Sequence, residues 1–316
     1  ASEVIDRVTQ VRQAWVNAVA SAQTLTYTQQ VLNSAQASAE LARRMEAVGN
    51  FNRLTRARHQ AFYADAATQL VTAQQNALAK REALVRMLGL TDAQAAQLKL
   101  PARLPNVPAQ AMDEKAVAQQ ASRQRLDVQM AQASLNAAAK AQGLVGITSV
   151  TDIELTARKG QVSSDTGNTT NRGYEVSVRL PVFDSGQMRR DAMNAQTLAA
   201  ANQLEATLRA AGSSLRESYA AYRSAHDISR HYKDEVLPLR KVMADENILR
   251  YNGMLIGVFE LLADARDQVR TVMSAIAADE QFWLADASLR ANLIGRPSSS
   301  RLSNLSSAPS SADAGH

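Results

Sequence analysis

Two stretches of this chain run for dozens of residues without the residues that end helices. Residues 1–47 contain neither proline nor glycine, and residues 184–252 have Gly186 near their start and only Gly212 and Pro238 further inside. Apolar residues in the first stretch recur three and four apart, which is typical of one face of an α-helix. At about 1.5 Å per residue the second stretch predicts an element roughly 100 Å long. Because no compact domain holds such a helix, the sequence predicts an elongated, mainly α fold.

The composition favours helices that pack closely. Aromatic residues make up only 4% of the chain, so a thick core built on large rings is not expected. The chain has no cysteine, which excludes disulfides and thiolate metal sites. Lys+Arg 35 against Asp+Glu 30 gives a net charge of +5, which does not indicate a nucleic-acid partner. No run approaches the ~20 apolar residues of a membrane-spanning helix, so any membrane crossing would use strands.

Turn signals divide the chain into helices and connections. Gly49 and Asn50 are suited to the positive φ of a helix end, Asn52 to the start of the next helix, and Gly89 to its close. We expect a first helical hairpin (1–99), an extended proline-rich linker (100–112), a short helical region with a helix over 113–141 (113–143), a β-hairpin (144–183), a second helical hairpin (184–295) and a disordered tail (296–316).

The period of the sequence changes from 3.6 to 2 in the fourth of these regions. Alternation over 152–158 and 174–180 predicts two strands of roughly ten residues each, joined by a polar loop over 161–171. The apolar face of the second strand consists of Tyr174, Val176, Val178 and Leu180. A half-buried hairpin on a soluble sheet and a strand pair of a transmembrane barrel both alternate in this way, so the residues alone leave both open.

The helical elements occur twice. A long helix, a turn glycine (Gly49, then Gly253), a returning helix and a closing glycine (Gly89, then Gly295) follow one another in both halves. The tetrapeptides Ala57-Arg-His-Gln60 and Ala265-Arg-Asp-Gln268 mark the returning helices. Duplication of a helical hairpin is the simplest account of this repeat, and such a repeat indicates architecture rather than a catalytic centre.

The order of these pieces resembles the TolC-type outer-membrane efflux duct family over about Val11 to Gly295. The resemblance is carried by Leu180-Pro-Val-Phe-Asp184 with Gly186 and Arg189-Arg190, by Tyr251-Asn-Gly253 before Phe259-Glu-Leu-Leu-Ala-Asp264, and by Gly89 and Gly295. It implies a homotrimer whose protomers add strands to a shared outer-membrane barrel and helices to a shared periplasmic tunnel. It also implies passive export, an inner-membrane pump and a periplasmic adaptor as partners, contact with outer-membrane lipid, and no cofactor.

One departure from the family pattern concerns the start of the chain. The family has two β-hairpins per protomer, whereas this sequence shows one, and its first long helix is about twenty residues shorter than its second. We therefore expect the first β-hairpin and the N-terminal segment, with any lipid-bearing cysteine, to be missing from this sequence.

The resemblance also assigns roles to residues near the two turns. Glu260 and Asp264 share a helix face and would ring the tunnel mouth, and Tyr251 would hold that mouth closed by a hydrogen bond to a neighbouring helix. By themselves, the carboxylates are more typical of a solvated helix start, where they favour the positive end of the helix dipole. The expected adaptor-contact residues are Gly49, Asn50, Arg53, Asn252 and Gly253. The lipid-facing residues would be Tyr174, Val176, Val178 and Leu180.

Nothing in the sequence recommends an enzyme. His226 and His231 are five residues apart, which is not the i, i+4 spacing of two metal ligands on one helical face. No phosphate-binding glycine loop is present. The remaining alternative to a channel subunit is a soluble scaffold of helical hairpins, and a basic nucleic-acid binder is disfavoured because the positive charges alternate with acids.

Overall fold

The computed structural model describes residues 2–148, 152–164, 167–179 and 187–295, with no side chain described over 144–186. The chain divides into two units, residues 1–124 with 214–316 and residues 125–213. Helices of the first unit are α1 (Ser2–Ala47), α2 (Arg53–Leu88), α3 (Asp92–Gln97), α4 (Glu114–Gln124), α7 (Leu237–Asn252) and α8 (Val258–Leu293). The second unit contains α5 (Leu126–Thr148), β1 (Asp152–Ser164) and β2 (Gly167–Arg179), and α6 (Gln187–His231) belongs to both.

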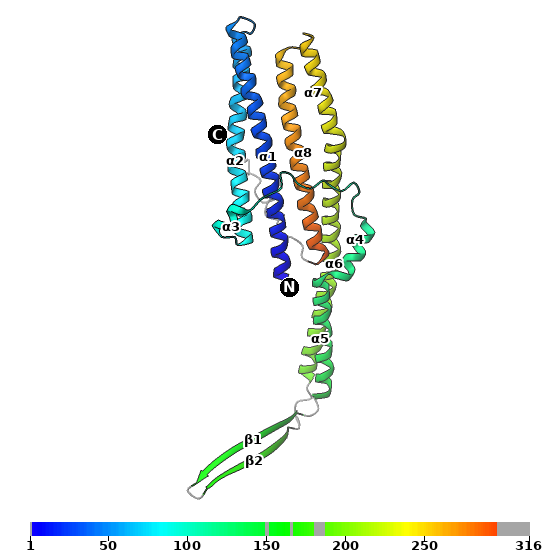
Figure 1. The fold of residues 1–316 in the computed structure, drawn as a ribbon. Helices are drawn as coiled ribbons and strands as arrows, with labels where there is room; N and C mark the ends of the chain where they lie inside the picture. Colours follow the sequence, from blue (N-terminus) through cyan, green and yellow to red (C-terminus); the bar gives the residue numbers. More distant parts are fainter. Residues whose placement is uncertain (1, 149–151, 165–166, 180–186, 296–316) are drawn as a thin grey trace, which may run out of the picture. The chain divides into compact units, whose positions relative to one another are not determined.

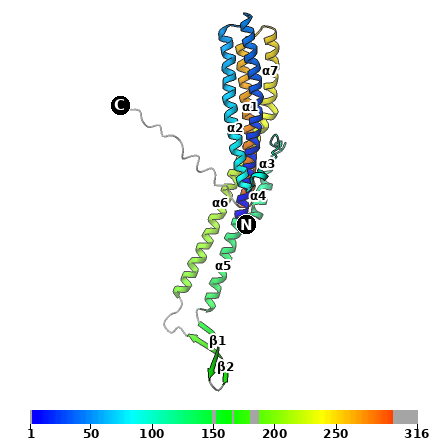
Figure 2. The same cartoon turned by 60° about the vertical axis from the view of Figure 1, so that its left-hand side comes forward.

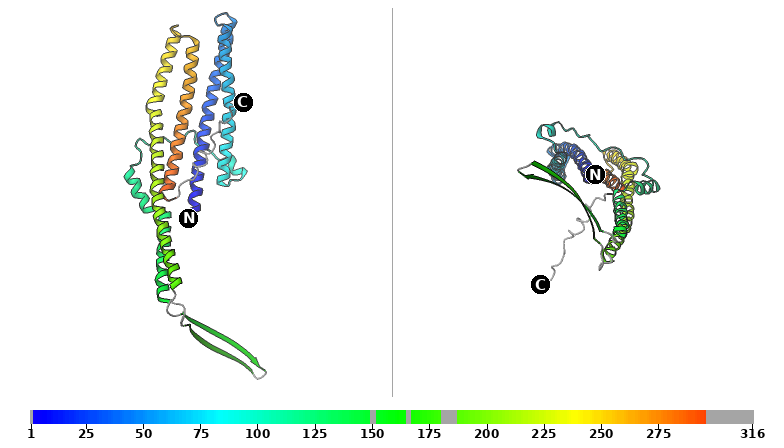
Figure 3. Two further views of the ribbon diagram at one scale, coloured as in Figure 1. Left: turned by 180° about the vertical axis from the view of Figure 1, so that it is seen from behind. Right: turned by 90° about the horizontal axis from the view of Figure 1, so that it is seen from below.

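The long helices of the first unit form one layer. They contact one another in the order α2, α1, α8, α7, so α2 and α7 lie at the two edges (Figures 1 and 3). The turn between α1 and α2 and the turn between α7 and α8 lie at the same end of this layer (Figures 1 and 2). The two helical hairpins predicted from the sequence are therefore present, and their tips are neighbours.

The linker predicted over 100–112 is confirmed as irregular, and we call residues 98–113 the belt. Side chains of several helices bind its backbone. Trp283 Nε1 of α8 donates to the Pro105 carbonyl at 3.0 Å, and His226 Nε2 of α6 lies 2.9 Å from the Pro108 carbonyl. Because an extended segment has no internal ladder, these contacts satisfy its backbone groups and fasten it to the layer.

The largest buried cluster of the unit lies under the belt. Val107 packs with Tyr222 of α6 and with Phe282 and Leu289 of α8, and the exposed fraction of Phe282 is 1%. The Tyr222 and Phe282 ring centroids are 5.5 Å apart. Rings at such distances stabilise a cluster beyond the area they bury. Tyr222 and Phe282 therefore join α6, α8 and the belt.

Two points of the helix prediction require correction. The helix predicted over 113–141 is broken at Arg125 into α4 and α5. Arg125 is buried, and its guanidinium binds Asp127 and the Ala211 carbonyl. A carboxylate in the first turn of α5 also favours a new helix start. The short helix α3 was missed, although its cap pair Thr91 and Gln94 is visible in the sequence.

The second long helix continues through Gly212 and Pro238, and its hydrogen bonding changes from α to π for one turn. Gly212 lies inside α6 without a break, and a π-helical turn, η1 (Tyr232–Val236), joins α6 to α7. Pro238 follows in the first turn of α7. A proline lacks the N–H that an α-helix needs in its interior, and a wider turn just before it accommodates that loss.

The second unit contains the predicted β-hairpin. β1 and β2 pair antiparallel, with Val178 opposite Ile153, Val176 opposite Leu155 and Tyr174 opposite Ala157. The predicted apolar residues of the two strands therefore lie at paired positions of the register. The strands have 13 residues each, so the loop predicted over 161–171 is wrong, because a backbone ladder forms between polar residues as well. Leu180 and the tail 296–316 lie outside the described residues.

Within the described residues, none of the helices combines the length and the hydrophobicity needed to pass through a lipid bilayer.

Candidate functional site at the helical tips

The two interhelical turns have the same backbone geometry. In the first, the Asn50 N–H donates to the Met45 carbonyl at 2.8 Å, and in the second the Leu255 N–H donates to the Arg250 carbonyl at 2.8 Å. Each is the six-residue closure of a Schellman-type helix end. The residue before each donor has a positive φ, 80° at Gly49 and 59° at Met254.

The helix starts after these turns match as well. Asn52 precedes α2 with φ −84° and ψ 164°, and Gly257 precedes α8 with φ −85° and ψ 163°. Both lie three residues beyond the positive-φ residue, and α2 and α8 have 36 residues each. The structure thus aligns Gly49 with Met254 rather than with Gly253, whose φ is −79°. The tetrapeptides of the sequence repeat are therefore not at equivalent positions, being three residues out of register.

The two turns differ in how well their residues suit this geometry. Gly49 takes the left-handed conformation without steric cost, whereas Met254, 92% exposed, takes it as a side-chain-bearing residue. The Asn52 side chain accepts a hydrogen bond from the Thr55 N–H at 2.7 Å, and Gly257 has no side chain to do so. The second turn therefore lacks both of the residue choices that stabilise the first.

Each tip residue expected from the sequence lies at one of these turns. Gly49, Asn50 and Arg53 are exposed at the first, and Asn252 and Gly253 are exposed at the second. Large apolar residues are exposed beside them, namely Val48, Leu54, Met254 and Leu255. This common end of the layer therefore exposes both polar and apolar groups.

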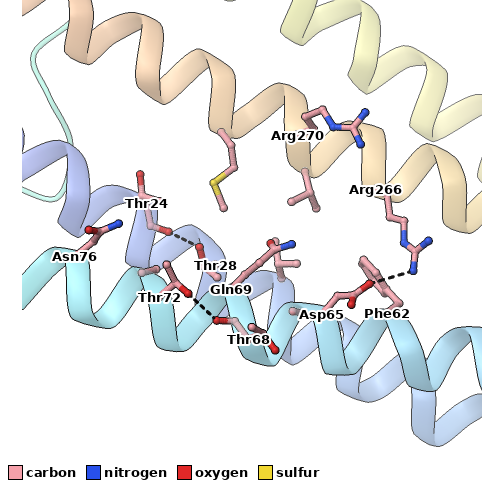
Figure 4. Close-up of a pocket in the computed structure, with 15 residues that line it drawn as sticks. Thr24, Thr28, Phe62, Asp65, Thr68, Gln69, Thr72, Asn76, Arg266 and Arg270 are labelled. Atoms are coloured by element: carbon pink, nitrogen blue, oxygen red, sulfur yellow. Dashed lines mark hydrogen bonds and ion pairs between the residues drawn. The ribbon is translucent and has the colours of Figure 1, made fainter. Parts of the chain in front are cut away.

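Two arginines connect the hairpins near the tips. The Arg58 guanidinium of α2 lies 3.6 Å from the ring centroid of Phe259 on α8. Further along, Arg266 of α8 lies 3.5 Å from the Asp65 carboxylate and 5.5 Å from the Phe62 centroid of α2 (Figure 4). Exposed ion pairs of this kind stabilise by about 0–1 kcal/mol. The ties between the tips are thus weak enough to break without unfolding either hairpin.

A groove separates α2 from α8 beside these ties. It has a volume of about 640 Å³ and is lined by residues of α1, α2 and α8 (Figure 4). The Thr28 and Thr72 hydroxyls donate to carbonyls one turn earlier in their own helices, at 2.8 and 3.1 Å. Their donor capacity is therefore used within the helices, so the groove is less polar than its composition suggests.

The candidate gate residues lie on the first turns of α8 and at the end of α7. Asp264 is largely covered and lies 3.9 Å from Arg240 of α7, while Glu260 is exposed. Tyr251 is half-buried, and its backbone carbonyl accepts the Met254 N–H at 2.9 Å. The carboxylates thus have unequal surroundings, and the roles expected for these three residues stay predictions.

The arginines near the first tip bind acids of their own hairpin. Arg56 pairs with Glu46, and Arg43 and Arg44 hold the pKa of Glu40 below its usual value by hydrogen bonds to its carboxylate. Arg58 instead reaches α8, where it meets an aromatic ring. Sequence reasoning missed Phe62, Asp65 and Arg266, although Arg266 belongs to the repeated tetrapeptide.

The described residues combine long paired helices, an irregular belt and one long β-hairpin. No protein-family model and no curated protein matches the chain. Among solved structures, a membrane protein from Pseudomonas aeruginosa matches with TM-score 0.74 and 20% identity, covering 92% of this chain and 69% of that one. VceC, an outer-membrane protein of Vibrio cholerae, matches with TM-score 0.72 and 16% identity, covering 92% and 70%.

A third match is the CmeC outer-membrane channel of Campylobacter jejuni, with TM-score 0.72 and 14% identity over 96% of this chain and 66% of that one. At these identities the similarity is one of fold. The chain has the fold of outer-membrane channel proteins, and the resemblance identified in the sequence is confirmed at that level.

The unequal turns give a reciprocal prediction. Gly49→Met should destabilise the first hairpin by about 1 kcal/mol, because φ of 80° is unfavourable for any side chain even though a Cβ there meets nothing within 4 Å. Met254→Gly should stabilise the second hairpin by about 0.5–1 kcal/mol. Urea unfolding followed by circular dichroism measures both. Opposite signs are expected, and equal effects would contradict the assignment of Met254 to the strained position.

Proposed function

We propose that this chain is the bulk of one protomer of a trimeric outer-membrane channel that extends into the periplasm. In this proposal the helical layers of three copies close into a tunnel, and each copy adds its β-hairpin to a shared transmembrane barrel. Exported solutes pass without energy input from the channel, which performs no catalysis. An inner-membrane pump supplies the energy and reaches the channel through a periplasmic adaptor that contacts the two tips.

The single observation that supports the trimer is the exposure of apolar side chains on the two edge helices, α7 and α2. No residue of α7 is buried, although the helix contains large apolar residues. The exposed fractions of Leu239, Val242 and Leu249 are 62%, 66% and 65%. At the other edge α2 exposes Val71 and Leu78, seven residues apart and so on one face. Apolar surface at both edges favours association with further layers.

The layer order decides which edges meet. Because α7 and α2 are opposite edges of the same layer, contact between them joins copies head to tail, and such contacts close into a ring when the rotation fits. Ring closure covers both apolar edges of every copy at once. A flat dimer formed through one edge would leave the other exposed.

The trimer is tested by placing a charge on one edge. In the full-length protein purified in detergent, Val242→Glu should shift the mass measured by light scattering from trimer to monomer, because an unpaired carboxylate would be buried between copies. Val8→Glu is the matched control, since Val8 is also exposed but lies on α1, in the middle of the layer. A Val242→Glu protein that stays trimeric, or a wild type that is monomeric, would count against the ring.

The gate proposal concerns Tyr251, Glu260 and Asp264. With threefold symmetry, two acids per copy would place six carboxylates around the tunnel mouth, as acidic rings do in cation-selective pores. Arg240 partly compensates Asp264, so Glu260 carries more of the free charge. The Tyr251 hydroxyl would hold the mouth closed by a hydrogen bond to a neighbouring helix.

Single-channel recordings of the full-length protein in planar bilayers test this gate. Glu260→Gln should lower cation selectivity more than Asp264→Asn, and the double variant should relieve block by divalent cations. Tyr251→Phe should raise conductance, because one hydrogen bond is worth about 1 kcal/mol and its loss leaves the fold intact. Wild-type selectivity and block in the double variant would reduce both acids to ordinary helix-start residues.

The hairpin proposal places Tyr174, Val176, Val178 and Leu180 against lipid. Strands of 13 residues exceed the 9–11 residues or so that a tilted transmembrane strand needs. Val176→Arg should cost about 2–4 kcal/mol near the membrane midplane and prevent outer-membrane insertion of the full-length protein. Ser177→Arg, on the other face, is the control and should insert normally. Membrane fractionation compares them, and equal insertion would favour the soluble-scaffold alternative.

A further inference from the structure

A buried histidine near the first tip has unequal surroundings at its two ring nitrogens. His59 of α2 is 7% exposed, and its Nδ1 lies 2.6 Å from the Ser38 hydroxyl of α1. Its Nε2 is buried and has no hydrogen-bond partner in the described part of the chain. The Phe51 ring of the tip turn stacks on the imidazole, with centroids 6.2 Å apart and planes at 13°. The imidazole therefore joins α1, α2 and the turn.

The surroundings of this ring suit only its neutral form. A neutral imidazole makes the single hydrogen bond with Ser38 in either tautomer, since the hydroxyl both donates and accepts. An imidazolium carries a proton on each nitrogen, so its Nε2–H would be a buried, charged donor without an acceptor. Burying such a group is far less favourable than burying a neutral one.

The charged residues of the neighbouring elements have other partners. On α1 the Glu40 carboxylate binds Arg43 and Arg44, and Glu46 binds Arg56 of α2. Arg58 lies over Phe259, and Asp264 of α8 faces Arg240. Glu260 is exposed. Burial is accordingly the cause that lowers the pKa of His59 below its ordinary value.

We propose that His59 is an acid-sensitive switch of the first tip: its neutral ring holds α1, α2 and the tip turn together, and its protonation releases them. In the closed tip the ring resists a proton, whereas in a locally opened tip the exposed ring takes one below about pH 6.5. Acidification therefore favours opening. The opening equilibrium should rise by at most about tenfold for each pH unit below that value, until the closed ring also titrates.

The consequence for export rests on the proposed function, because the first tip is there one of the two adaptor contacts. The switch itself is a property of one hairpin. It is therefore measured on the purified chain without a membrane, an adaptor or a trimer, so a failure of the channel proposal leaves this test intact.

Amide hydrogen exchange read by mass spectrometry tests the switch. Wild type, His59→Gln and His231→Gln are compared at each pH from 7.5 to 5, so that the intrinsic exchange rate cancels between proteins. His231 is the matched control, since its side chain is 59% exposed. In wild type and His231→Gln, peptides covering 36–62 should exchange increasingly faster than in His59→Gln as the pH falls. An equal pH dependence in all three overturns the proposal.

A second measurement needs no variant to fold. In a nuclear magnetic resonance titration of histidine-labelled wild type, the His59 ring should titrate below the pH of about 6.5 that is ordinary for a free imidazole, and peak broadening around Ser38 and Phe51 should accompany it. A His59 ring that titrates at or above the ordinary imidazole value of about 6.5 overturns the switch, whatever the exchange data show.

Discussion

Narrow seams of alanine between neighbouring helices are the constraint on which the first unit depends. On α1 the nearly inaccessible alanines are Ala18, Ala20, Ala35 and Ala42. Small side chains let helices approach closely at little cost in side-chain entropy, but each buries little apolar area. A seam of this kind stabilises only if it is long, which is why these helices have dozens of residues. α1 and α8 contact a neighbour on each side, whereas α2 and α7 lie at the edges, so the result is a layer with two edges rather than a closed bundle.

Large side chains are concentrated where the belt crosses the layer, and this decides which end of the unit is rigid. Tyr222, Phe282 and Leu289 are nearly inaccessible there, and Trp283 holds the belt by a hydrogen bond. At the tips, far from the belt in Figure 1, the hairpins are tied by two arginines over aromatic rings and one exposed ion pair. Anchoring at one end and weak ties at the other favour motion of the tips while the belt region stays fixed.

The sequence predicts elements well where a single residue determines the backbone. Gly49, Asn52 and Gly89 mark turns and caps by their own conformational preferences, and all three lie where expected. It fails where tertiary contacts decide. The break at Arg125 depends on the Ala211 carbonyl, which is distant in sequence. The strained position of the second turn fell on Met254 because closure by Leu255 places it there, although Gly253 is the residue that suits it.

The sequence predicted where the candidate site lies, but not which of its side chains contact one another. Which arginine meets which acid or ring depends on the rotation of each helix, so Arg58 and Phe259 could not be paired from spacing. Each tip nevertheless has a feature that destabilises its turn. The second turn is destabilised at every pH by the positive φ of Met254 and by the uncapped start of α8. In our proposal the first turn is destabilised only when His59 is protonated. Because Arg58 and Phe259 belong to different tips, movement of either tip removes a contact that stabilises both. We infer that acid makes the first tip resemble the second, and that the two tips then loosen together.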